Sequence, residues 1–129
     1  MSNTIQLGPN QTLDVRTSTP EVLEMEATWT PGSTVPPAHL HPNQDEHFEV
    51  LEGELTVVTD DEERTLRAGD VLDVPRGTAH KMWNGSGAQT RATWRVTPAL
   101  KTEEMFRTIA GGGAEDFLER FADEFRLAL

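Results

Sequence analysis

The sequence predicts an all-β domain followed by a short helical region. Three observations lead to this expectation. Between residues 11 and 97, apolar and polar residues alternate in short runs, as they do in strands with one buried face. Glycine and proline separate these runs at close intervals, which is typical of a barrel or sandwich of antiparallel strands. After Pro98, apolar residues recur instead at the spacing of a helix.

Size and composition limit the classes of protein to consider. A chain of 129 residues is expected to form a single domain, 1–129, with the β-barrel at about 11–97 and the helical segment at about 98–129. The chain has no cysteine, which excludes disulfides and thiolate metal sites. Its net charge of −11 argues against nucleic acid and anionic membranes as partners, because both repel an acidic surface.

The sequence shows neither a transmembrane segment nor a secretory signal peptide. No apolar run approaches the roughly 18 residues that a transmembrane helix needs. The first residues lack a basic region followed by an apolar run, so a secretory signal is not expected. We therefore expect a cytoplasmic protein.

Two strands are expected before the first histidine. Thr12–Val15 forms a possible edge strand after a turn at residues 8–10. Val22–Thr30 alternates regularly and is expected to be a half-buried strand. Its expected inward residues are Leu23, Met25, Ala27 and Trp29.

A cluster of metal-ligand side chains follows between residues 37 and 53. His39 and His41 are two apart, which on a strand places both imidazoles on one face. Turn-type residues at 42–44 allow the chain to return as a second strand, on which Glu46 shares the apolar face of Phe48. A carboxylate in such a row needs a compensating charge, and a cation held by two imidazoles would supply it. The alternative is that these are solvated polar residues near a hairpin. His47 alternates outward, so we do not expect it to be a ligand.

The later strands repeat the alternating pattern. A charged turn at residues 60–62 separates two short runs, and another turn precedes Val71–Val74. After a Pro-Arg-Gly turn, His80 and Met82 share one face. Thr90–Thr97 is the last expected strand. Inward residues expected in these later strands are Leu72, Val74, Ala92, Trp94 and Val96.

These residues match the two motifs of the cupin family, which the chain resembles from about residue 32 to residue 84. The first motif is G(x)5–6HxH(x)3–4E(x)6G, and its matching residues are Gly32, His39, His41, Glu46 and Gly53. The second motif is G(x)5PxG(x)2H(x)3N, and its matching residues are Gly69, Pro75, Gly77, His80 and Asn84. The resemblance implies a jelly-roll (double-stranded β-helix) barrel. It also implies one metal ion held by His39, His41, Glu46 and His80.

The ligand set restricts the metal only loosely. Three imidazoles and one carboxylate accept Mn, Fe, Co, Ni, Cu or Zn. On an octahedral ion, four protein ligands leave two positions for water, substrate or dioxygen. Strand parity predicts an apolar and aromatic pocket beside the ion, suited to a small organic ligand. Its expected walls are Met25, Trp29, Phe48, Leu72, Val74, Met82 and Trp94.

Three functions remain open at this point, because the cupin fold serves several chemistries. The first is a metal-dependent, dioxygenase-like oxidoreductase that acts on a small hydrophobic or aromatic molecule. The second is a non-redox isomerase or cyclase that uses the ion as a Lewis acid. The third is a non-catalytic small-ligand-binding protein, favoured by the lack of an evident second catalytic group. A homodimer is expected, because small cupins commonly pair and an N-terminal edge strand would otherwise be exposed.

The C-terminal region is expected to contain two helices. Thr102–Ala110 has helical spacing and ends at three consecutive glycines. In Ala114–Leu127, one face of the expected helix would carry Phe117, Leu118, Phe121, Ala122 and Phe125. We expect this stripe to pack on the barrel or on a second subunit, as a structural cover.

Overall fold

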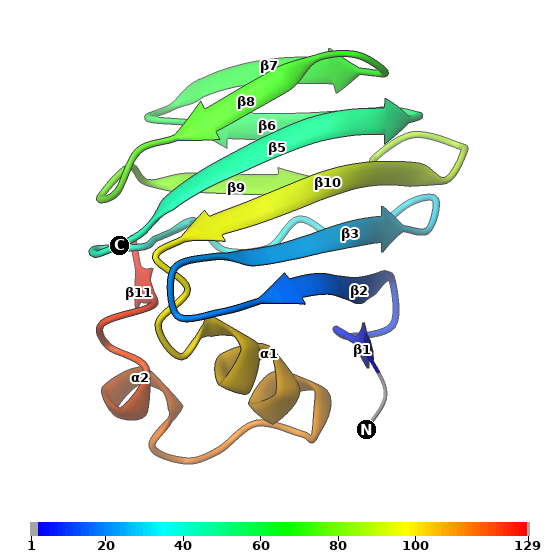
Figure 1. The fold of residues 1–129 in the computed structure, drawn as a ribbon. Coiled ribbons are helices and arrows are strands. Elements are labelled where there is room, and N and C mark those ends of the chain that lie inside the picture. Colours follow the sequence, from blue (N-terminus) through cyan, green and yellow to red (C-terminus); the bar gives the residue numbers. More distant parts are fainter. Residues whose placement is uncertain (1–2, 129) are drawn as a thin grey trace.

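Two antiparallel sheets enclose the core in the computed structural model, which describes residues 3–128 (Figure 1). The six-stranded sheet has the order β1 (Thr4–Gln6), β2 (Gln11–Ser18), β3 (Leu23–Trp29), β10 (Thr90–Thr97), β5 (Asp45–Glu52) and β8 (Val71–Val74). The five-stranded sheet has the order β11 (Arg126–Leu127), β4 (His39–Leu40), β9 (His80–Trp83), β6 (Glu54–Thr59) and β7 (Glu62–Arg67). The all-β prediction is confirmed.

Alternation along each strand divides its residues between the core and the solvent. In β3, Leu23, Met25, Ala27 and Trp29 are buried, and the three residues between them are half-buried, as predicted. In β5, Glu46, Phe48 and Val50 are buried. Burying one large apolar side chain contributes roughly 1.5–3 kcal/mol, so this regular pattern fixes the register of each strand.

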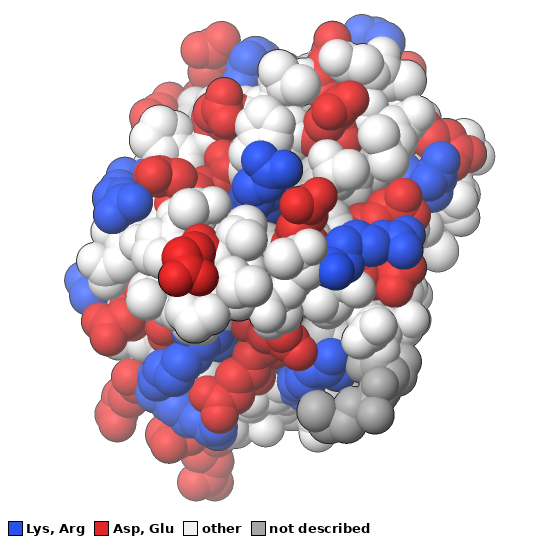
Figure 2. Space-filling model, viewed as in Figure 1, with Lys and Arg blue, Asp and Glu red and all other residues white. Residues whose placement is uncertain are grey.

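The outer face of the six-stranded sheet carries intermixed charges (Figure 2). Arg91 on β10 forms ion pairs with Glu26 on β3 at 3.0 Å and with Glu52 on β5 at 2.7 Å. Arg95 pairs with Glu24 at 3.5 Å. Opposite charges on neighbouring strands favour this strand order, although each exposed pair contributes only about 0–1 kcal/mol.

The predicted edge strand at residues 12–15 is part of β2, and it is not at the edge. β2 lies between β1 and β3, because Thr4–Gln6 pairs with residues 12–14. The short strand β1 therefore forms this edge of the sheet, and the expected homodimer stays a prediction.

The C-terminal region departs from the predicted pair of long helices. The helix α1 (Thr102–Ala110) is confirmed, and Gly112 and Gly113 follow it with φ angles of 105° and 87°. The second predicted helix is wrong over most of its length: α2 (Phe117–Arg120) is a single turn, followed by turns and β11. Phe121 is fully buried, and Phe125 stacks on the ring of His39. These tertiary contacts override the helical spacing.

The helical region covers one side of the sandwich. In Figure 1, α1 and α2 lie beyond the β1–β2 edge of the six-stranded sheet. Met105 and Phe106 of α1 are buried, and the ring of Phe106 lies 5.2 Å from that of Trp94 on β10. The expected covering role of this region is thus visible in its packing. Within residues 3–128, no helix is long and apolar enough to cross a membrane.

Candidate metal centre and adjoining cavity

Three histidines converge between the two sheets. His39 and His80 face each other as paired residues of β4 and β9, and His41 lies just after β4. One ring nitrogen from each histidine lies within 4.8 Å of the others. His41 and His80 are buried, and His39 is half-buried. Strand pairing thus brings together ligands that are far apart in the sequence.

Glu46 enters the cluster from the opposite sheet. Its Oε1 atom lies 3.1 Å from Nε2 of His41 and 2.9 Å from Nε2 of His80. Its other oxygen, Oε2, accepts a hydrogen bond of 2.7 Å from the indole nitrogen of Trp94. This bond fixes the carboxylate so that Oε1 points toward the histidines. The structure therefore groups the three histidines and places Glu46 against two of them, His41 and His80.

The outward-facing nitrogens of two histidines are bonded to backbone carbonyls. Nδ1 of His80 lies 2.9 Å from the carbonyl oxygen of Thr78, and Nδ1 of His41 lies 2.7 Å from that of Glu124. Nδ1 of His39 is 3.5 Å from the carbonyl oxygen of Pro37, a long contact. A carbonyl can only accept, so in His41 and His80 the proton resides on Nδ1. Nε2 is then free to bind a metal ion.

The inward-facing atoms fit a divalent cation. Nε2 of His41, Nε2 of His80 and Oε1 of Glu46 are buried, and none has a hydrogen-bond partner of good geometry within residues 3–128. Buried polar atoms without partners are costly, and a cation at their meeting point would satisfy all three. The donors are three imidazoles and one carboxylate, which suit first-row transition metals.

The electrostatics of the cluster favour an ionised Glu46 carboxylate and a neutral His39 imidazole. Burial, together with the imidazoles of His80 and His41, lowers the pKa of His39 to about 4. Burial also lowers the pKa of His41, but the adjacent Glu46 outweighs this effect, so the pKa of His41 lies above its ordinary value. Burial raises the pKa of Glu46, yet His41 and His80 bring it well below its usual range. Glu46 is therefore ionised at neutral pH and ready to bind a cation.

A cavity of about 160 Å³ adjoins the cluster. Four of the seven predicted wall residues line it: Trp29, Phe48, Met82 and Trp94. Met25, Leu72 and Val74 do not line it, which corrects the prediction. They point inward as expected and are buried in the core, but strand parity only separates inside from outside. It does not say which stretch of the interior stays open.

Sequence parity also missed seven residues that line the cavity. They are Leu7, Gln11, Pro36, Met105, Phe106, Ile109 and Phe125. Three come from α1 and one from the C-terminal segment, which the sequence indicated only as an apolar cover. Apart from the four candidate ligands, Gln11 is the one polar side chain among the described lining residues. No second carboxylate and no lysine lines the cavity within residues 3–128.

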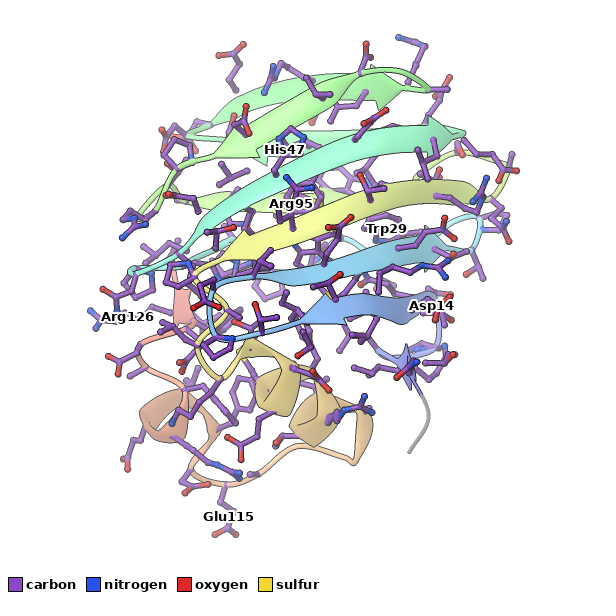
Figure 3. All side chains as sticks on the ribbon, viewed as in Figure 1. Asp14, Trp29, His47, Arg95, Glu115 and Arg126 are labelled. Atoms are coloured by element: carbon purple, nitrogen blue, oxygen red, sulfur yellow. The ribbon has the colours of Figure 1, made fainter. Side chains whose placement is uncertain are left out.

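Two polar residues near the ligands in the sequence, His47 and Glu52, lie outside the histidine cluster. His47 lies on the outer face of the six-stranded sheet with Arg95 (Figure 3), and its Nδ1 is 2.6 Å from the Asp73 carboxylate. It points away from the cluster, as predicted. Glu52 is exposed and pairs with Arg91.

Two motif residues outside the ligand set serve the fold. The buried amide of Asn84 donates to the carbonyl oxygens of Trp29, Thr30 and Ala88, which ties together two loops. Gly53 has a φ angle of 80°, and a Cβ atom there would collide with the carbonyl oxygen of Gln89. Only glycine fits such a position.

The fold and the cluster together define a class of protein: a double-sheet β-barrel with a three-histidine, one-carboxylate centre. A family model described as a cupin domain matches residues 25–96, more than half of the chain. The chain belongs to the cupin family, as the two sequence motifs had indicated.

Individual relatives share part of the chain. The oxidoreductase iacF of Pestalotiopsis fici is 49% identical over 53 residues, which cover 40% of this chain and 26% of that protein. The quercetin 2,3-dioxygenase of Bacillus subtilis is 37% identical over 71 residues, covering 55% of this chain and 20% of that protein. The matched stretches thus span about a quarter and a fifth of the length of these two relatives. The solved structure of KdgF from Halomonas sp. has a TM-score of 0.71 at 20% identity, covering 78% of this chain and 91% of that one. This likeness concerns the fold.

Proposed function

We propose that this cupin is a metal-dependent oxidoreductase of the dioxygenase type that acts on a small hydrophobic or aromatic molecule. One observation carries the proposal: the cluster of three histidines and Glu46 faces a cavity whose other walls are apolar and largely aromatic. A metal site beside an apolar pocket suits an organic substrate with a ligating group. The names of the two curated relatives, an oxidoreductase and a dioxygenase, support the same reaction class.

Three groups of residues would hold the metal ion, position a ligand and exclude water. His39, His41, His80 and Glu46 would hold one transition-metal ion, which supplies open coordination positions for substrate and dioxygen when bound. Trp94 fixes the Glu46 carboxylate through its indole hydrogen bond. Phe48, with its ring 5.3 Å from that of Trp94, forms an aromatic wall that excludes water.

The cavity limits the size of the substrate. An apolar protein cavity of about 150 Å³ binds benzene, so 160 Å³ accommodates about one aromatic ring. The side chain of Gln11 lines this otherwise apolar space, and its amide can both donate and accept hydrogen bonds. It is thus available to a hydroxyl or carbonyl group of the substrate. A phenol or a small diketone meets both requirements.

A second candidate is non-catalytic binding of the same class of ligand. The absence of any lysine or further carboxylate from the described cavity walls favours it, because no dedicated acid or base adjoins the candidate ligands. A non-redox isomerase would need such a group or a metal-bound base, so we rank it third.

Oxygen consumption separates these functions. The protein is stripped of metal, reloaded separately with Fe²⁺, Mn²⁺, Ni²⁺, Cu²⁺, Co²⁺ and Zn²⁺, and mixed with catechol, phenol or acetylacetone in an oxygen electrode. The proposal expects oxygen uptake with at least one redox-active ion, and none with Zn²⁺ or with His80→Ala. If these compounds bind at micromolar to millimolar concentration without oxygen uptake under any metal, the oxidoreductase proposal fails.

A further inference from the structure

The C-terminal segment 121–128, here called the strap, contacts the candidate ligand His41 on the side of the ring that faces away from the metal position. The carbonyl oxygen of Glu124 accepts the 2.7 Å hydrogen bond from Nδ1 of His41, across a separation of 83 residues. The corresponding contacts of His39 and His80 are local, to carbonyls two residues earlier in the chain. Among the three histidines, His41 alone has its ring hydrogen bond to a distant segment.

The strap also touches the neighbouring ligand and closes the cavity. The ring of Phe125 stacks on that of His39, with centroids 4.9 Å apart and planes inclined by 23°, and it lines the cavity. β11 pairs with β4, so that Leu127 lies opposite His39. The amide of Ala128 donates to the carbonyl oxygen of Ala38 at 3.0 Å.

Further contacts hold the strap in this place. Phe121 is fully buried. The carboxylate of Glu124 accepts a hydrogen bond of 3.2 Å from the backbone amide of Lys101, which precedes α1. The side-chain amide of Asn43 donates to the carbonyl oxygen of Asp123 at 3.1 Å. The strap is therefore anchored on both α1 and the turn that carries His41.

We propose that the strap is a positioning element of the metal centre, and that its docking and metal binding are thermodynamically coupled. The Glu124 carbonyl holds the proton of His41 on Nδ1 and fixes the ring, which leaves Nε2 directed at the ion. When the strap is undocked, His41 loses this partner and Phe125 leaves the cavity wall. Coupling of this kind is reciprocal: the factor by which undocking weakens metal binding equals the factor by which the metal favours docking. The inference rests on the metal site proposed above.

The first test uses the full-length protein and Zn²⁺ alone. Hydrogen–deuterium exchange is followed by mass spectrometry in peptides that cover residues 121–128, with and without saturating Zn²⁺. Exchange in these peptides should slow by about tenfold or more when Zn²⁺ binds, because the outer partners of metal ligands typically change metal affinity by about 10–100-fold. Peptides from β7, which is remote from the cluster, serve as the control and should not change. Equal exchange of the strap with and without bound Zn²⁺ would overturn the proposal.

The second test removes the strap contacts directly. A chain that ends at Asp123 retains the buried Phe121 but lacks the Glu124 carbonyl, Phe125 and β11. Its affinity for Zn²⁺, measured by competition with a chromophoric chelator, should fall by about 10–100-fold. Leu118→Ala is the matched control, because Leu118 is an exposed apolar residue of the same region that does not line the cavity. Unchanged affinity in a folded truncated protein would contradict the proposal. Should the truncated chain fail to fold, the exchange experiment decides.

A double-mutant cycle distinguishes positioning from general support of the fold. In a His41→Ala background, the truncation should lose the part of its effect on Zn²⁺ affinity that acts through the bond from His41 to Glu124, because that ligand is gone. A full additional effect in that background would contradict positioning of His41 by the strap. Zn²⁺ binding without any coupling refutes the strap proposal alone, whereas a wild-type protein that binds no transition metal refutes the proposed function.

Discussion

At the scale of single residues, three of the four candidate ligands have a close hydrogen-bond partner on the side away from the metal position. Trp94 fixes the carboxylate of Glu46, Thr78 accepts from His80, and Glu124 accepts from His41. Such partners set which atom faces the ion, and they explain why polar groups can be buried here at acceptable cost. The indole group of Trp94 and the carbonyl groups of Thr78 and Glu124 are therefore part of the candidate site, together with the ligands.

Substitution of the ligands should remove the metal. His41→Ala and His80→Ala each delete one of four donors, so we expect both variants to retain far less metal than the wild type after dialysis. His47→Ala is the control, because His47 is half exposed on the outer face and pairs with Asp73. Metal content measured by plasma mass spectrometry checks this expectation. A His47→Ala protein as depleted as His41→Ala would contradict the placement of these strands.

Substitution of Trp94 should weaken metal binding without removing a ligand. Trp94→Phe keeps an aromatic ring in the cavity wall but deletes the donor to Oε2 of Glu46. We expect affinity for Zn²⁺ to fall by about 10-fold or more, as is typical when a partner of a metal ligand is lost. Trp83→Phe, on β9 and outside the cavity lining, is the matched control. Chelator competition gives both affinities, and equal values would argue against the role of the indole group.

Metal binding should weaken on acidification. The pKa of His41 is raised by Glu46, so in the metal-free protein this ring gains its proton before a free histidine would, above pH 6.5. Below that pKa the metal must displace one proton, and affinity is expected to fall about tenfold for each pH unit. His39, with a pKa of about 4, stays neutral throughout this range. Titrations with Zn²⁺ between about pH 8 and 5.5 test the slope, and a flat profile would exclude His41 as a ligand.

At the scale of elements, contacts between loops hold the short strand that carries His39. β4 contains only two residues, and it is held between β9 and β11. The loop that precedes β4 is connected to the end of β9, where Ser33 donates to the carbonyl oxygen of Asn84. Since Asn84 also ties the ends of β3 and the β9–β10 loop together, one buried side chain positions several connections around the cluster.

Loss of this buried amide should destabilise the fold. Asn84→Ala removes an amide whose two N–H groups are shared among three backbone carbonyls, and it leaves those carbonyls without that partner. At about 1 kcal/mol for each N–H group, we expect the free energy of unfolding to drop by about 2 kcal/mol. Gln89→Ala, an exposed amide in the adjoining loop, is the control and should change it by less than about 0.5 kcal/mol. Urea denaturation measures both, and similar values for the two variants would refute the assignment.

At the scale of the whole molecule, the metal position joins the two sheets and the C-terminal region. His39, His41 and His80 belong to the five-stranded sheet and its adjoining turn, whereas Glu46 belongs to the six-stranded sheet. A bound ion would therefore link the two layers of the sandwich across the core. It would also favour the native state, because this arrangement exists only when both layers are assembled.

Metal should raise the stability of the whole domain. At a free metal concentration about 100-fold above Kd, linkage adds about 2.7 kcal/mol to the free energy of unfolding. For a domain of this size we expect Tm to rise by roughly 5–15 °C. The same ion should leave the Tm of His80→Ala almost unchanged. Scanning calorimetry of both proteins with and without Zn²⁺ is the measurement, and an equal rise in both would place the binding elsewhere.

The sequence by itself determined the strand faces and the family, and it predicted a ligand set. Residues two apart on a strand share a face, so the parity of His39 and His41, of Glu46 and Phe48, and of His80 and Met82 can be derived locally. A charged residue within an apolar row is a local signal too, and the structure places that residue, Glu46, beside His41 and His80. The spacing of the two motifs then indicated the cupin family, which the family model confirmed.

Only the tertiary structure decided how the cavity is closed. The spacing at residues 114–127 is that of a helix, but the burial of Phe121, the bond from His41 to Glu124 and the pairing of β11 with β4 stabilise a different path. Local periodicity cannot register such contacts, because each partner lies about 80 residues away. For the same reason the sequence could not show that Gln11, Met105 and Phe125 meet at one cavity, since only strand order and packing bring them together.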